Sequence, residues 1–172
     1  FSPTAGRMSA IEVLKGSSQI QYGPHTTGGV INYISTPIPD EPAGFIKTTY
    51  GTDNDFRAHV YYGRICDLGS AGNFGFLIEG YFHSNDGYKD FFSAPDFSGD
   101  DTGFTNIEPM VKLMWEPDSE QYQRFEFKFG YSDREADETY LGLSESDFGS
   151  DPYKRYAASR FDNFDADQER YY

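Results

Sequence analysis

From Arg124 to Tyr131 the chain reads RFEFKFGY, in which aromatic residues alternate with charged ones. Successive side chains of a β-strand point to opposite faces, whereas a helix would scatter the phenylalanines around its circumference. The pattern therefore predicts a strand at about 122–131 and favours a β-fold. We expect an aromatic face made of Phe125, Phe127, Phe129 and Tyr131, and a charged face made of Arg124, Glu126 and Lys128.

Comparable segments recur along the chain and predict an all-β fold of about six strands. The other expected strands lie at 44–51, 56–66, 73–83, 107–115 and from about 165 onward. Alternating strands of about 9–11 residues suit a tilted strand that crosses a membrane. Alternation alone leaves open which face is buried, because a soluble sandwich turns its apolar face inward.

The connections between these strands differ strongly in length. Short turns are expected at 67–72 and 117–120, and long loops at about 84–106 and 133–163. Outer-membrane barrels have short periplasmic turns and long extracellular loops, so the alternation of lengths indicates such a barrel. The turn at 52–54 is short although it would lie on the outer side.

Composition excludes several classes of protein. The 172 residues carry a net charge of −14 without a basic stripe, which argues against nucleic-acid binding. The chain contains no run of about 18 apolar residues, so a membrane-spanning helix is not predicted. No signal peptide is visible at Phe1, which suggests that the sequence is a fragment. The single cysteine, Cys66, excludes an internal disulfide.

A glycine-punctuated stretch, 11–36, precedes the alternating strands. It contains IEVLKG at Ile11–Gly16, then Tyr22-Gly23, then GGVIN at Gly28–Asn32. In this order and spacing the stretch resembles the C-terminal end of the plug domain of TonB-dependent outer-membrane receptors. The resemblance assigns a structural plug motif made of Gly16, Tyr22, Gly23, Gly28, Gly29 and Asn32.

This resemblance divides the chain into three parts. Residues 1–36 would be the C-terminal part of the plug, with short buried strands at 11–14 and 30–34. The proline-rich segment 37–43 would be the linker. Residues 44–172 would be the first strands of a transmembrane β-barrel that needs about 22 strands to enclose a plug.

Two loop segments, 138–143 and 151–159, are similar to a loop of the ferric dicitrate group of these receptors. The similarity implies active transport of a ferric chelate across the bacterial outer membrane. TonB would act through an N-terminal segment upstream of residue 1, and outer-membrane lipid would surround the strands. The chelate would be the transported ligand, with no other cofactor and no enzymatic activity.

An anionic ferric chelate needs cationic donors, and Arg binds carboxylates in bidentate fashion. The candidate ligand contacts are Arg134, Arg155 and Arg160, with His83 at the upper rim and Gln21 and His25 beside the plug motif. The alternative is that the arginines pair with loop acids such as Asp151 and fold the loop.

Other functions remain open. The same receptor type could carry cobalamin or an oligosaccharide, and a soluble β-sandwich binding module would also alternate. The plug-like stretch argues against a passive porin, which would have no plug. The acidic residues at 96–101 and 165–169 lack the spacing of an EF-hand, so solvated loops are the preferred interpretation over a calcium site.

Overall fold

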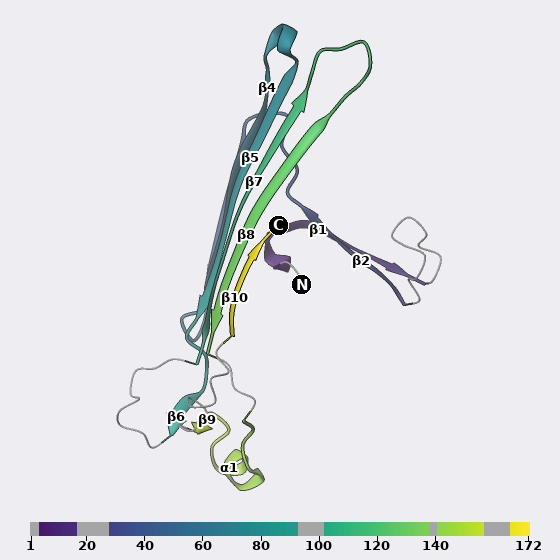
Figure 1. Ribbon diagram of the computed structural model, residues 1–172. Helices are drawn as coiled ribbons and strands as arrows, with labels where there is room; N and C mark the ends of the chain where they lie inside the picture. The colour runs from purple at the N-terminus through teal and green to yellow at the C-terminus, as the bar shows by residue number, and fades with distance from the viewer. Residues whose placement is uncertain (1–3, 17–27, 93–101, 138–140, 157–165) are drawn as a thin grey trace.

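The computed structural model describes residues 4–16, 28–92, 102–137, 141–156 and 166–172. It is an all-β structure, as predicted (Figure 1). The elements in chain order are η1 (Ala5–Arg7), β1 (Met8–Lys15), β2 (Gly29–Ser35), β3 (Ala43–Tyr50), β4 (Phe56–Asp67), η3 (Gly69–Ala71), β5 (Asn73–Asn85), β6 (Asp90–Phe92), β7 (Phe104–Glu116), β8 (Phe125–Ala136), α1 (Glu145–Ser150), β9 (Lys154–Tyr156) and β10 (Ala166–Tyr171).

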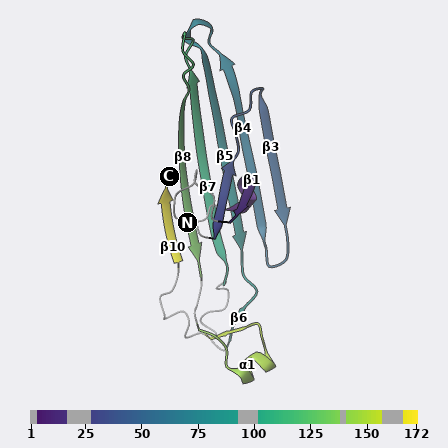
Figure 2. The ribbon, with the colours of Figure 1, turned by 90° about the vertical axis from the view of Figure 1, so that its right-hand side faces the viewer.

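Six strands form one antiparallel sheet in the order β10-β8-β7-β5-β4-β3, with β3 and β10 at its edges (Figure 2). All six strands were predicted, but some ends differ: β5 continues to Asn85 and β7 begins at Phe104, both inside the expected loop, and β8 differs most. Residues 122–124 belong to the turn before it. Asp133–Ala136, expected in a loop, extend β8 because they pair with β7 on one side and with β10 on the other.

The two faces of this sheet differ in chemistry. One face, here called the outer face, is apolar and exposed, with Ile46 at 75%, Phe127 at 62% and Ile78 at 58% of full exposure. The opposite, inner face carries buried charged side chains such as Glu79 and Glu108. The aromatic and charged faces predicted for 124–131 therefore exist, and the aromatic one is the exposed one.

Connection lengths follow the predicted asymmetry. The turns 68–72 and 117–124 lie at one end of the sheet. The long connections that follow β5 and β8 begin at the other end, where the short turn 51–55 also lies (Figure 1). The two long loops are joined to each other, since β6 pairs in parallel with β9.

The N-terminal strands β1 and β2 form a separate two-stranded sheet that projects from the inner face (Figure 1). Both strands were predicted, but their expected burial is wrong. Ile11, Val13 and Ile31 are exposed, because no second layer within the described part of the chain covers the hairpin.

The segment between β2 and β3 runs along the inner face near the short-turn end. An added Cβ at Gly63 of β4 would lie 2.9 Å from Cδ of Pro39 and 2.6 Å from the Phe76 carbonyl oxygen. Glycine at this position lets the proline-containing segment approach the sheet closely. Within the described residues, no helix has the length and apolarity to cross a membrane.

Candidate functional site

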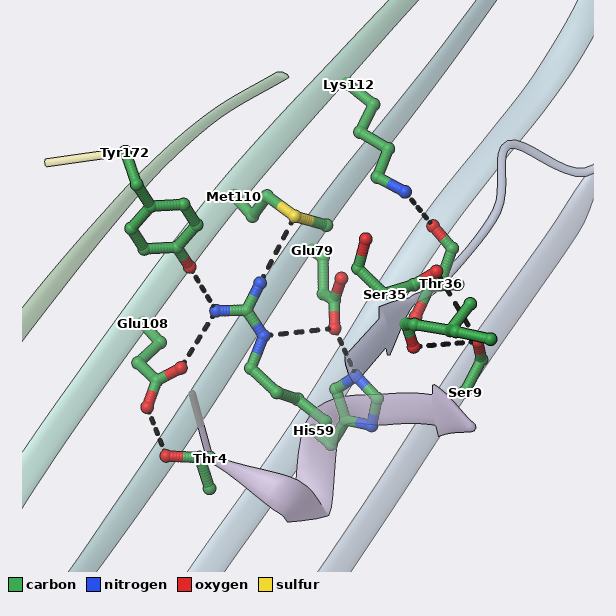
Figure 3. Close-up of polar contacts among 12 residues, drawn as sticks. Thr4, Ser9, Ser35, Thr36, His59, Glu79, Glu108, Met110, Lys112 and Tyr172 are labelled. Atoms are coloured by element: carbon green, nitrogen blue, oxygen red, sulfur yellow. Dashed lines mark hydrogen bonds and ion pairs between the residues drawn. The ribbon is translucent and has the colours of Figure 1, made fainter. Parts of the chain in front are cut away.

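The N-terminal segment is fastened to the inner face through Arg7, the last residue of η1. Its side chain is only 1% exposed. Nη1 donates to Oε2 of Glu108 at 2.8 Å and to the hydroxyl of Tyr172 at 2.5 Å, and Nη2 points at Sδ of Met110. Figure 3 shows that Glu79, Glu108, Met110 and Tyr172 converge on this point from the sheet.

Two buried carboxylates face the guanidinium. Glu108 also accepts hydrogen bonds from the Thr4 hydroxyl and, at 2.8 Å, from Nδ2 of Asn106. Glu79 lies 3.6 Å from Arg7 Nε, an ion-pair distance that is too long for a hydrogen bond. Arg7 Nε and Glu79 Oε2 are both buried without a hydrogen-bond partner. The Glu79 oxygen at 3.6 Å from Arg7 Nε is Oε1, which lies 2.8 Å from Nε2 of His59.

The charge on Arg7 is secured by these neighbours. Burial alone lowers the pKa of the guanidinium, but the hydrogen bonds to Glu108 and Tyr172 and the charge of Glu79 outweigh it and raise that pKa. Arg7 is thus a permanent cation between two carboxylates, and we call Arg7, Glu79 and Glu108 the inner-face ion cluster.

A second tie joins β7 to the end of the N-terminal hairpin. Lys112 Nζ donates to the backbone carbonyl of Thr36 at 2.7 Å, and both residues are buried (Figure 3). Arg7 precedes β1 and Thr36 follows β2, so the hairpin is held to the sheet at both of its chain connections.

A small cavity of about 100 Å³ lies between η1 and strands β3, β4 and β5. Its lining is polar and holds several hydrogen-bond donors. The lining residues are Gly6, Lys47, Thr49, Arg57, His59 and Tyr81.

His83, predicted at the upper rim, lies at the long-loop end of β5. Its Nε2 is 3.0 Å from Oδ2 of Asp55, which also pairs with Arg57. The His83 ring stands edge-on to Phe104, with centroids 4.6 Å apart. Arg134 lies over the same Phe104 ring at 5.3 Å, so the structure brings these two predicted residues together.

The other predicted contacts are placed differently. Arg155 is 5% exposed and donates to the backbone carbonyl of Asp137 at 2.7 Å, which suits the alternative that it folds the loop. Arg160, Gln21 and His25 lie outside the described residues.

Within the plug-like motif, the described residues have distinct roles. Gly16 and Gly29 adopt positive φ angles, of 106° and 127°. At Gly29, an added Cβ would lie 2.4 Å from the Leu14 carbonyl oxygen. At Gly28, an added Cβ would meet no described atom within 4 Å. Of these two neighbouring glycines, Gly29 is therefore the one whose position requires glycine. Asn32 donates to Glu12 across the hairpin, and Tyr22 and Gly23 lie outside the described residues.

No group of three or more His, Cys, Asp or Glu side chains that could hold a metal ion occurs among the described residues. The acidic segment at 96–101 lies outside them. Sequence reasoning missed the inner-face ion cluster and Lys112. The available signal was the presence of Glu79, Glu108 and Lys112 near the middle of otherwise aromatic strands.

No family model matches the chain, and no solved structure matches it.

Proposed function

We propose that the chain forms part of a transmembrane β-barrel with an internal plug, and that it takes part in TonB-dependent transport of a ferric chelate across the bacterial outer membrane. The ferric chelate is citrate-like or siderophore-like. The six strands of the large sheet form the first part of the barrel wall, and residues 1–36 belong to the plug.

The observation that carries this proposal is the inverted polarity of the sheet. Its charged face is buried under the N-terminal segment, while Ile46, Ile78 and Phe127 of the apolar face are exposed. A soluble antiparallel sheet packs its apolar face on a core and solvates the polar one. A membrane barrel does the reverse, with apolar side chains toward lipid and a polar interior.

Dimensions support the same interpretation. Strands β5 and β7 have 13 residues each. At ~3.3 Å per residue and a tilt of ~45°, such strands cross roughly 30 Å, about the thickness of a bilayer core. Arg64, on the outer face, lies near the short-turn end, where a long cationic side chain can reach the lipid headgroups.

The inner-face ion cluster suits a plug that must stay seated in a barrel. Breaking one partner of a buried ion pair is strongly unfavourable, so the segment stays docked at rest. Among the described residues, its polar ties to the sheet gather around Arg7 and around the Lys112 contact with Thr36. A force applied to the plug from the periplasm can release such contacts without unfolding the wall.

The membrane part of the proposal is tested by a pair of lysine substitutions in β8. Phe129 is on the outer face near the middle of the strand, and Glu126 is on the inner face. Phe129→Lys should cost about 2–4 kcal/mol in a bilayer and so reduce the amount of assembled protein. Glu126→Lys should assemble normally. Equal yields of both variants from the outer-membrane fraction would contradict the proposal.

The cargo is tested by uptake in cells that carry or lack the gene. Radiolabelled ferric citrate, cobalamin and a labelled oligosaccharide are supplied separately, with and without an uncoupler of the inner-membrane proton gradient. The proposal expects gradient-dependent entry of ferric citrate alone. Entry of another cargo would keep the receptor type and change the ligand. A soluble protein without uptake would favour the β-sandwich binding module.

A further inference from the structure

We infer that the cavity between η1 and strands β3–β5 is a binding site for a small oxyanion, either a carboxylate or a phosphate group. That the natural occupant is a carboxylate arm of the cargo rests on the proposed function. The oxyanion site itself rests on the cavity, its donors and its charge.

The sheet register brings the donors together. Lys47 of β3 pairs with His59 of β4, which pairs with Tyr81 of β5. Thr49 and Arg57 form the adjacent rung on the same face. Directly opposed side chains in a sheet have Cβ atoms about 4.5–5.5 Å apart, so these five side chains converge on one small space.

The charges at this space are unbalanced toward the positive. Arg57 pairs with Asp55 at 2.9 Å and His59 pairs with Glu79 at 2.8 Å. Lys47 has no carboxylate within ion-pair distance among the described residues. A lysine opposite a histidine and beside an arginine gains from an anion placed between them.

Neutral donors complete the site. The hydroxyls of Thr49 and Tyr81 make no hydrogen bond with the described residues. The Tyr81 hydroxyl would lie 3.1 Å from a Cβ at Gly6, so the absence of a side chain there keeps this wall of the cavity open. Since no carboxylate lines the cavity, an acceptor-only ligand such as carboxylate or phosphate matches it.

The size of the cavity limits what can enter. Its volume of about 100 Å³ is well above the roughly 10–15 Å³ that one water molecule needs. One carboxylate or phosphate group fits into this space, and the exposed side chains of Lys47 and Thr49 leave it open to solvent on one side. The cavity is therefore a subsite for one arm of a larger ligand, or for a free anion.

The test is calorimetric titration of the protein, purified from its membrane in detergent, with citrate, inorganic phosphate and neutral triethyl citrate. Citrate should bind and the neutral ester should not. Phosphate binding with the affinity of citrate would identify a general oxyanion site, and citrate binding alone a carboxylate site. Lys47→Gln should weaken citrate binding about tenfold, the effect of losing one charge-assisted hydrogen bond.

Lys128→Gln is the matched control, because Lys128 lies on the same inner face at the other side of the sheet. Thr49→Val tests the cavity without changing its charge and should also weaken binding. Unchanged affinity in Lys47→Gln and Thr49→Val, or equal loss in Lys128→Gln, would overturn the inference. An outer-membrane protein that fails to bind citrate here would refute this site and leave the proposed function standing. Specific citrate binding by a protein absent from the membrane would support this site and refute the proposed function.

Discussion

The inner-face ion cluster predicts a large effect for Arg7→Met. This substitution keeps most of the side-chain volume but leaves Glu108 and Glu79, which are 3% and 2% exposed, without their cation. Removing one partner of a buried ion pair costs about 3–5 kcal/mol. The hydrogen bonds to Glu108 and Tyr172 are lost together with the charge. The open, undocked state should therefore rise about 10²- to 4 × 10³-fold in population.

A thiol beneath the docked segment measures this opening. Met110 is 1% exposed and lies under the Arg7 guanidinium, so Met110→Cys in a Cys66→Ser background reacts with a water-soluble thiol reagent only when the segment undocks. The labelling rate, divided by that of the unfolded chain, gives the opening equilibrium. Lys15→Met, which removes an exposed cation of β1, is the control and should leave the rate unchanged.

A third variant separates charge from packing. Arg7→Met combined with Glu108→Met removes both partners, and apolar replacements of buried ion pairs are often tolerated. The double variant should recover much of the lost docking energy, with the charge of Glu79 limiting the recovery. A change below tenfold in Arg7→Met, or additive losses in the double variant, would refute this account of the cluster.

Two further predictions concern the hairpin and the second long loop. Gly29→Ala should destabilise the β1–β2 hairpin by about 1–3 kcal/mol, because Gly29 has φ of 127°. Gly28→Ala should leave the stability of the hairpin unchanged. Equal amide-exchange rates at Leu14 in the two variants would contradict this difference. The hydrogen bonds from Tyr156, then from Lys154 and Ser144, lower the pKa of Asp147 from 3.8 to about 2. The loop contacts of Asp147 should thus persist above pH 4 and disappear as the pH falls through about 2. The Tyr156 ring resonances should follow this titration in the native protein and stay constant in Asp147→Asn, whereas a midpoint near 3.8 would argue against these bonds.

The strands could be predicted because each carries its own signal. Period-2 alternation is local, so the six strands of the sheet follow from sequence alone, and only their ends shift where polar residues such as Asp133 and Glu135 continue pairing. Which face of the sheet is exposed could not be predicted from the sequence, because an alternating pattern is the same whichever face is buried.

The ion cluster could not be predicted, because its members are far apart in the chain. Arg7 and Glu108 are separated by 101 positions, and nothing local to Arg7 indicates a buried partner. Helix α1, in contrast, left a local signal that was missed. Ser144 caps it by accepting from the backbone N–H of Asp147, a pattern of Ser followed three residues later by an acid that is typical of a helix start.

The parallel pairing of β6 with β9 has an immunological consequence. Asp90–Phe92 and Lys154–Tyr156 are paired strands from different loops, and Tyr88 packs edge-on against Tyr153. The surface presented at this end is therefore a composite of two distant stretches of sequence. Antibodies raised against the folded protein should recognise epitopes that neither loop peptide reproduces, and a deletion in one loop should remove the binding of antibodies that contact the other.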